Sequence, residues 1–212
     1  VNVKSIHSEY IDKENIDKNL NNLDGIIVAP GFGQRGLDGK ILAVEFARVN
    51  KIPFLGICLG MQMAVIEYAR NVKKIRYANS TEISEKCKDP VIDLMTSQKE
   101  IIDMGGTMRL GAWDCEILKN TISHKVYKKK LISERHRHRY EFNNDYSKKI
   151  FDDNFIVAGF NPDTKLVEII ENIDHPWFVG VQFHPEYKSS VYNPHPIFVN
   201  FVKASLKKYL NK

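Results

Sequence analysis

The sequence contains no long apolar run and no internal repeat. Its longest uncharged stretch, residues 52–66, is shorter than the roughly 18 apolar residues that a membrane span needs, and Pro53, Gly56 and Gly60 interrupt it. We therefore expect no membrane partner. No basic and then apolar leader opens the chain, so we expect no signal peptide, and Val1 in place of Met predicts a fragment of a longer chain.

Cysteine is also scarce. Cys58, Cys87 and Cys115 are odd in number and irregularly spaced, which argues against a disulfide framework or a zinc site. Reduced thiols predict a cytoplasmic location. Four of the seven histidines, His7, His124, His175 and His195, have no spacing typical of metal ligands, so we expect no metal site.

The net charge of +5 is small and the lysines are dispersed, with dense spots such as 128–130 and 207–208. This pattern favours no nucleic-acid partner. With 43% hydrophobic and 27% charged residues, the 212-residue chain has the composition of a globular protein and is long enough to bury one core. No linker divides it, so we expect one domain.

Apolar runs alternate with helical patterns in the first third of the chain. Strands are predicted at 1–6, 25–28 and 52–57, and helices at 41–49 and from 60 to about 72. Such alternation indicates an α/β fold with a doubly wound, mostly parallel sheet and helices on both faces. Later segments are extended and predict an antiparallel extension, followed by a helix at about 196–210. These segments are 91–95, 107–110, 155–160, 166–170 and 178–183, of which the last two read as an antiparallel pair.

Cys58 lies where an apolar strand gives way to a helix, with Gly56 and Gly60 two positions to either side. This is the arrangement of a nucleophile elbow, and it predicts a tight turn that lifts the sulfur into the open. The first turn of a helix favours a thiolate and lowers the pKa of a cysteine. The N–H of Leu59 would then face a tetrahedral oxyanion. A buried structural thiol between two packing glycines is the alternative.

His184 and Glu186 flank Pro185 at the end of a predicted strand. An extended i, i+2 pair projects both side chains to the same side, and the proline restricts His184 to extended angles. A carboxylate beside an imidazole fixes its tautomer and stabilises its cation, which suits a proton carrier for a cysteine nucleophile. A solvent-facing pair at a strand end is the alternative.

Together, the segments 56–62, 184–186 and Pro30-Gly31-Phe32-Gly33 resemble the three signature motifs of class I glutamine amidotransferases, in the order in which that family has them. Segments 79–82, 105–111 and 134–141 are similar to those of the glutaminase domains of CTP synthases. The resemblance runs through nearly the whole chain. It implies the class I glutamine amidotransferase-like fold.

The resemblance also implies an activity. Glutamine would be hydrolysed to glutamate and ammonia through a thioester on Cys58, with His184 and Glu186 completing a catalytic triad. The ammonia would aminate UTP in an ATP-dependent synthase domain of the same longer chain, and that domain is absent here. No P-loop is present at 33–40. We expect no cofactor in this domain, while ATP, UTP, GTP and Mg²⁺ are implied for a full-length enzyme, which would be a homo-oligomer; the fragment itself would be a monomer.

Residue by residue, the resemblance assigns the oxyanion N–H donors to Gly31 and Leu59, and it makes 32–36 a loop that covers the site. The implied substrate-binding residues are Gly31, Phe32, Leu59, Gly60, Met61, Gln62, Glu82 and Arg139. Two departures stand out. Pro30 replaces a glycine of the family motif and has no N–H to donate, and the strand and helix that usually precede the strand predicted at 1–6 are missing.

Three alternatives stay open. The run 135–139, Arg-His-Arg-His-Arg, could be a nucleic-acid patch, but Glu134 and Glu141 bracket it and Tyr140 is its one aromatic neighbour, so we interpret it as structure that supports the site. The chain could be the glutaminase domain of another amidotransferase, such as GMP synthetase. It could also be a non-catalytic regulatory module of the same fold.

Overall fold

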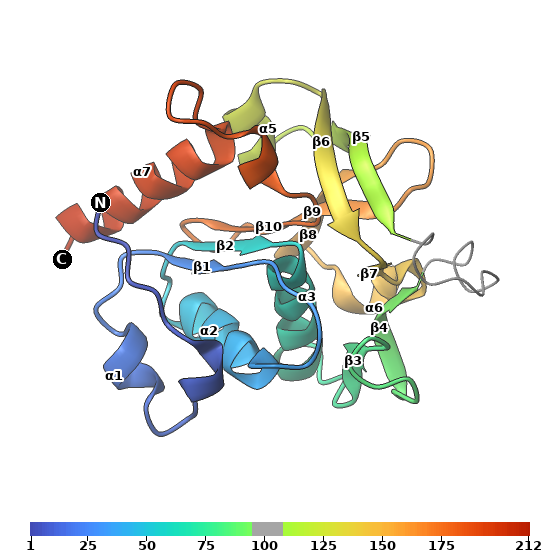
Figure 1. The fold of residues 1–212 in the computed structure, drawn as a ribbon, viewed down its shortest axis with the longest axis horizontal. Helices are drawn as coiled ribbons and strands as arrows, with labels where there is room; N and C mark the ends of the chain where they lie inside the picture. Colours follow the sequence, from blue (N-terminus) through green and yellow to red (C-terminus); the bar gives the residue numbers. More distant parts are fainter. Residues whose placement is uncertain (95–107) are drawn as a thin grey trace.

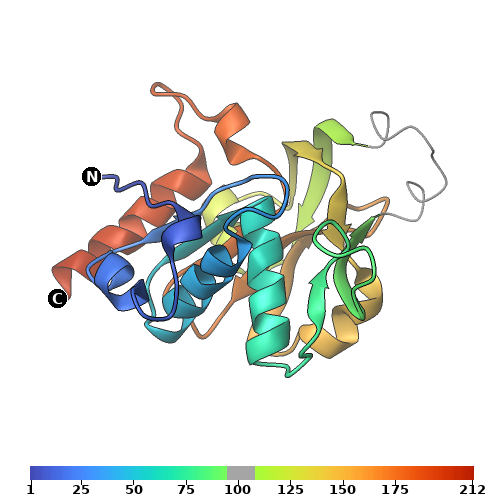
Figure 2. The same cartoon turned by 60° about the horizontal axis from the view of Figure 1, so that its bottom comes forward.

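A seven-stranded sheet forms the centre of the protein, and helices cover both of its faces (Figure 1). The computed structural model describes residues 1–94 and 108–212. The strands of the large sheet lie in the order β1 (Ile26–Val28), β2 (Phe54–Ile57), β10 (Phe178–Val181), β9 (Val167–Asn172), β8 (Phe155–Phe160), β5 (Arg109–Ile117) and β6 (Leu131–His138). A small sheet of β3 (Ala78–Ser80), β4 (Asp89–Leu94) and β7 (Tyr140–Phe142) stands beside α3 (Leu59–Asn71) (Figure 2).

The pairing of the large sheet changes at β10. Strands β1, β2 and β10 pair in parallel, whereas β10, β9, β8, β5 and β6 follow one another in antiparallel pairs. The α/β class and the antiparallel extension are thus confirmed, including the predicted β9–β10 pair. The expectation of a mostly parallel sheet is wrong, because within the described residues two pairs of neighbouring strands of this sheet are parallel and four are antiparallel. Parallel pairing of β2 with β10 sets the carboxyl ends of these two strands side by side, although they are far apart in the sequence.

The helices form a layer on each face of the sheet. Helices α2 (Leu37–Val49) and α3 lie on one face, and α5 (Ile122–Tyr127) and α7 (Pro196–Leu210) lie on the other (Figure 1). The remaining helical segments are short: η1 (Ser8–Tyr10), α1 (Ile16–Leu20), η3 (Asn144–Tyr146), α6 (Ser147–Ile150) and η4 (Pro185–Lys188). None of the helices within residues 1–94 and 108–212 has the length and apolar character to cross a bilayer.

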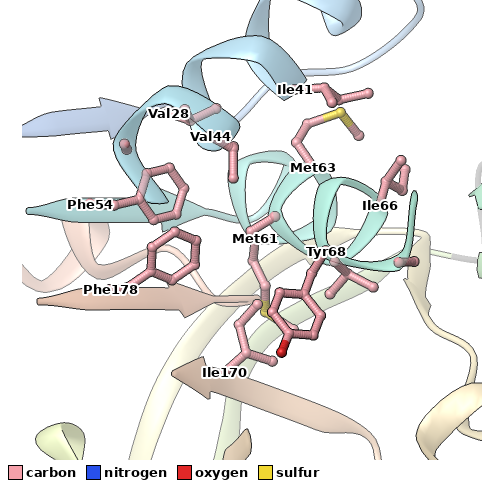
Figure 3. Packing of buried hydrophobic residues seen from close by; sticks show 14 of the residues in the cluster. Val28, Ile41, Val44, Phe54, Met61, Met63, Ile66, Tyr68, Ile170 and Phe178 are labelled. Carbon is pink, nitrogen blue, oxygen red and sulfur yellow. The ribbon is translucent and has the colours of Figure 1, made fainter. Parts of the chain in front are cut away.

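Alternating side chains of the central strands fill two separate cores. Phe54 and Phe178 point toward α2 and α3 and stack with ring centroids 4.4 Å apart (Figure 3). Their neighbours Leu55 and Val179 belong to the opposite core, beneath α7. Both faces of β2 and β10 are fully buried for this reason, which explains why these strands are continuous apolar runs rather than alternating ones.

The strand predicted at 1–6 is wrong. These residues form no strand, and the side chains of Val1 and Val3 are 99% and 87% exposed. Two valines at alternate positions give the sequence pattern of a strand, but no neighbouring strand pairs with these residues. Helix α2 begins at Leu37, four positions before the predicted start, because Leu37 continues its buried stripe. Residues 95 and 105–107 of the predicted segments lie outside the described residues.

A closed ring of buried charged side chains joins the two sheets. We call Arg109, His136, His138, Glu141 and Glu168 the buried charge ring; each is at most 3% exposed. Arg109 contacts Glu168 at 2.6 Å and Glu141, on β7 of the small sheet, at 3.3 Å. One ring nitrogen of His136 lies 2.8 Å from one of His138. The segment 138–140, which borders the site described below, is held by this ring.

Burial shifts the pKa of both acids and both histidines of the ring toward their neutral forms. It raises the pKa of Glu141 to about 8 and that of Glu168 to about 7, although the charge of Arg109 opposes both shifts. It lowers the pKa of His138 to about 3 and that of His136 well below its ordinary value, and Arg109 adds to both effects. The buried charge ring therefore favours neutral imidazoles and protonated carboxyl groups.

These shifts predict that the free energy of unfolding is highest over a middle range of pH and falls at lower and at higher pH. The raised acids contribute stability below pH 4.5, their ordinary pKa, and lose it as pH rises through about 7 to 8. The depressed histidines contribute stability above pH 6.5 and lose it as pH falls. Between these values the two trends offset each other. We expect urea unfolding to give its highest free energies between about pH 4.5 and 6.5.

Glu141→Gln tests the assignment of the alkaline decline. The amide cannot ionise, so the variant should lose less stability than the wild-type protein between pH 6.5 and 8.5. Equal slopes for the two proteins over this range would contradict the role of Glu141.

Gly60 allows the first turn of α3 to pack directly on β1. A Cβ added at Gly60 would lie 2.1 Å from the carbonyl oxygen of Val28, so the backbone would have to move. We expect Gly60→Ala to lower the free energy of unfolding by about 3 kcal/mol. Gly111→Ala is the matched control, because no atom lies within 4 Å of its added Cβ and only the left-handed φ of +80° opposes it. It should cost about 1 kcal/mol. Equal losses in urea unfolding would refute the close approach.

Candidate active site

Cys58 occupies the corner between β2 and α3. Its φ is 52° and its ψ is −104°, a strained combination for a residue with a Cβ. The surrounding structure enforces this corner. The Cys58 N–H donates to the carbonyl of Val181 on β10 at 2.7 Å, and a Cβ at Gly56 would lie 2.7 Å from the Gly60 carbonyl. Glycines at both positions therefore let strand and helix meet at the angle that the elbow requires.

The sulfur is buried rather than lifted into the open. Cys58 is only 3% exposed, and burial raises the pKa of its thiol to about 12. The Leu59 N–H bonds to the sulfur and lowers this pKa, whereas the charges of Glu186, Glu82 and Glu141 raise it further. The expected open thiolate is thus a wrong prediction for this state of the protein, because desolvation outweighs the helix N-terminus.

His184 and Glu186 form a close pair, as predicted. The Nδ1 atom of His184 lies 2.6 Å from Oε1 of Glu186, and the imidazole stacks on the Tyr187 ring with centroids 4.9 Å apart. The reason differs from the predicted one. Pro185 begins the 3₁₀ helix η4, so Glu186 reaches the imidazole through a turn and not through an extended strand. Acid and aromatic ring together fix the orientation of His184.

Cys58 and His184 each follow one of two neighbouring strands that pair in parallel. Cys58 directly follows β2, and His184 lies three positions after β10, whose Val181 pairs with Ile57. Within the described residues no hydrogen bond joins the sulfur to the imidazole, and the buried Nε2 of His184 has no hydrogen-bond partner there. The nitrogen that would exchange a proton with a substrate is therefore unengaged in this structure.

A small cavity of about 30 Å³ lies beside Cys58. It brings together many of the predicted substrate-binding residues. Its walls are Gly31, Phe32, Cys58, Gln62, Glu82, Met108, His138, Arg139 and Tyr140. The side chain of Met61 is instead fully buried in the core between α3 and the sheet (Figure 3). The structure also places Gly60 against Val28 and away from the cavity wall.

The two predicted oxyanion donors lie close together. A Cβ added to Gly31 would be 3.3 Å from Cδ2 of Leu59 and 3.2 Å from Nζ of Lys40. Burial lowers the pKa of Lys40, and the charge of Cys58 opposes this shift. The ammonium group of Lys40 thus lies next to Gly31 of the glycine loop. Its positive charge favours negative charge on the sulfur or on a nearby oxyanion.

The glycine loop is fastened to the small-sheet side of the site. The Gly33 N–H donates to Oε1 of Glu82 at 3.0 Å, and the Gln34 amide donates to the carbonyl of Ile83 at 2.9 Å. The guanidinium of Arg137 lies 5.7 Å from the centre of the exposed Phe32 ring. Outside residues 95–107, no group of three or more His, Cys, Asp or Glu side chains is arranged to hold a metal ion.

Sequence reasoning missed several residues near the sulfur. Among them are Lys40, Met108, Tyr140 and Gln182. His138 lies in the run 135–139, which the sequence already indicated as structure that supports the site. Gln182 carried a usable signal, because it is a polar residue inside an apolar strand end and only two positions before His184. Lys40 carried little signal in the sequence, since the side chain of a lysine in the first turns of a helix is usually solvated.

The family model of the class-I glutamine amidotransferases matches residues 1–204. The CTP synthase of Flavobacterium johnsoniae is 60% identical over 206 residues, which are 97% of this chain and 38% of that protein. The CTP synthase of Christiangramia forsetii is 61% identical over 205 residues, again 97% of this chain and 38% of that protein. The chain thus spans well under half the length of these relatives.

Solved structures give the same picture. The glutaminase domain of Trypanosoma brucei CTPS with bound acivicin is similar with a TM-score of 0.90 and 39% identity, over 97% of this chain and 81% of that one. A putative GMP synthase subunit from Thermoplasma acidophilum, at 19% identity and a TM-score of 0.60, shares the fold over 91% of this chain and 78% of that one. The chain therefore belongs to the class-I glutamine amidotransferases and, among them, to the glutaminase domains of CTP synthases.

Proposed function

We propose that the protein hydrolyses L-glutamine to glutamate and ammonia. The sulfur of Cys58 attacks the side-chain carboxamide carbon, and the thiol proton passes through His184 to the departing nitrogen, which leaves as ammonia. A water molecule then attacks the resulting thioester with His184 as the base, and the sulfur regains its proton as glutamate forms. One observation carries the proposal: a sulfur on a strained corner shares one sheet edge with an imidazole held by a carboxylate.

The buried thiol gives His184 a defined role. Because the pKa of Cys58 is raised to about 12, the sulfur rests as a thiol and must lose its proton when the substrate arrives. The Nε2 of His184 is free of hydrogen bonds within the described residues and is suited to take that proton. Glu186 stabilises the imidazolium that forms. Gly31 and Leu59 are proposed to hold the oxyanion with their N–H groups.

The cavity walls suit the amino-acid end of glutamine. Glu82 would bind the substrate ammonium and Arg139 its carboxylate, while Gln62 borders the same cavity. The loop that carries the exposed Phe32 forms one wall of the cavity. Two hydrogen bonds hold it on this side, from the Gly33 N–H to Glu82 and from the Gln34 amide to the Ile83 carbonyl.

For the longer protein, we propose that residues 1–212 supply ammonia to a synthase domain of the same chain, which would aminate UTP to CTP with ATP and Mg²⁺ and respond to GTP. The high identity to CTP synthases that are much longer than this chain supports the proposal. A cytoplasmic location and a homo-oligomeric full-length enzyme remain predictions, as does a monomeric state of the fragment.

Labelling with an electrophilic glutamine analogue tests the nucleophile. We expect the wild-type chain to take up one label at Cys58, located by peptide mass spectrometry, and Cys58→Ala to take up none. All three cysteines are free thiols, so Cys87→Ala is a matched control that should still be labelled. Label on Cys87 or Cys115, or equal labelling of Cys58→Ala, would refute the assignment. Labelling without glutamine turnover would favour the regulatory alternative.

Glu186→Gln tests the orienting carboxylate. The amide keeps the shape of the side chain but cannot stabilise an imidazolium, so we expect kcat to fall by roughly 100-fold with little change in KM. Glutamate release measures both constants. Glu14→Gln, which changes an exposed carboxylate beside α1, is the control. An unchanged kcat in Glu186→Gln would remove Glu186 from the mechanism.

A further inference from the structure

Gln182 is a buried amide at the carboxyl end of an otherwise apolar strand. It is 0% exposed, and its backbone N–H donates to the carbonyl of Glu168 at 2.9 Å. The residue therefore has a fixed backbone next to the site. Burying an amide costs free energy unless its hydrogen bonds are made, so the partners of this side chain indicate why a glutamine stands there.

The partners of Gln182 define which way its amide points. Nε2 of Gln62 lies 2.9 Å from the carbonyl oxygen of Tyr140, an obligate acceptor, so this atom of Gln62 must be the donor. The same nitrogen lies 3.3 Å from Gln182, which must present its oxygen there. The nitrogen of Gln182 is thereby turned toward Cys58, and it lies 3.7 Å from the sulfur. One backbone carbonyl thus orients two amides in series.

We propose that Gln182 is a positioning residue for the nucleophile: its amide N–H holds the sulfur of Cys58 and favours the thiolate over the thiol, while Gln62 fixes the orientation of that amide. The proposal rests on Cys58 being the nucleophile, as proposed above. It adds a second N–H donor to the backbone N–H that Leu59 supplies from the start of α3. The second donor is a neutral side chain at the residue that directly follows β10.

The bond changes strength along the reaction without any transfer of the amide proton. A hydrogen bond to an anionic acceptor is stronger than one to a neutral acceptor, so the Gln182 N–H binds most tightly once the thiol proton has moved to His184. When the sulfur bonds to the substrate carbon, it becomes a neutral thioester and a weak acceptor. The Gln182 amide therefore lowers the free energy of the thiolate, and its hydrogen bond to the sulfur weakens once the thioester has formed.

This arrangement also changes the role of Gln62. Its Nε2 serves the Tyr140 carbonyl and Gln182 together, so this nitrogen is committed to orienting Gln182. Gln62 borders the cavity as the sequence suggests, yet its donor group faces the protein. A substitution at Gln62 should therefore disturb the sulfur as well as any substrate contact.

The pH dependence of Cys58 alkylation tests the proposal on the whole chain. Iodoacetamide reacts with the thiolate, and peptide mass spectrometry separates Cys58 from the buried Cys115 in the same sample. In Gln182→Met, which keeps the bulk and removes the donor, we expect alkylation of Cys58 at a fixed pH near 8 to slow by roughly threefold to tenfold, with its titration moved to higher pH. Gln62→Met should shift it in the same direction by less.

Gln182→Glu preserves size and should shift the titration further, because a carboxylate beside the sulfur opposes the thiolate. Unchanged alkylation of Cys115 shows that the fold is intact, and a loosened core would expose Cys58 and Cys115 together. An unshifted Cys58 titration in folded Gln182→Met overturns the proposal. If that variant unfolds, an unshifted Gln62→Met or Gln182→Glu overturns it instead. A shifted titration in a chain that does not turn over glutamine would refute the glutaminase proposal alone.

Discussion

The positive φ of Cys58 is the constraint on which the site depends. A residue with a Cβ in this conformation costs on the order of 1–3 kcal/mol and persists only where its surroundings leave no alternative. Here the Cys58 N–H is bound by Val181, and Gly60 sits against the Val28 carbonyl, so β10 and β1 both hold the corner. The direction of the sulfur and the place of the Leu59 N–H follow from the fold as a whole.

A second constraint is the balance of charge around the buried sulfur. Three carboxylates, Glu82, Glu141 and Glu186, oppose a thiolate, and burial opposes it more strongly. The N–H groups of Leu59 and Gln182 act in the other direction. The nucleophile consequently rests protonated, which protects it from oxidation and from electrophiles other than a bound substrate. In the proposed reaction, activation then depends on transfer of the thiol proton to His184 when the substrate is bound.

Local patterns predicted some parts of this site and tertiary packing decided the others. Glycine spacing predicts the corner at Cys58. The i, i+2 spacing predicts the His184–Glu186 pair, although the pair forms through the turn of η4 and not through an extended strand. The burial of the sulfur depends on how β10 packs beside β2, which no local pattern contains. Strand β6 escaped prediction because Arg and His are both polar. Only the folded sheet separates His136 and His138, inside, from exposed Arg135 and Arg137.

The parallel pairing of β2 with β10 has a consequence for biosynthesis. The chain must close a loop of more than a hundred residues before Cys58 and His184 can meet, and such non-local contacts form late and slowly. A nascent chain that has not yet emerged beyond β9 holds the cysteine and glycine loop but lacks the imidazole, and the edge of β2 is still unpaired. The proposed release of ammonia therefore cannot begin before nearly all of this domain has been synthesised, and the unpaired edge is exposed during that interval.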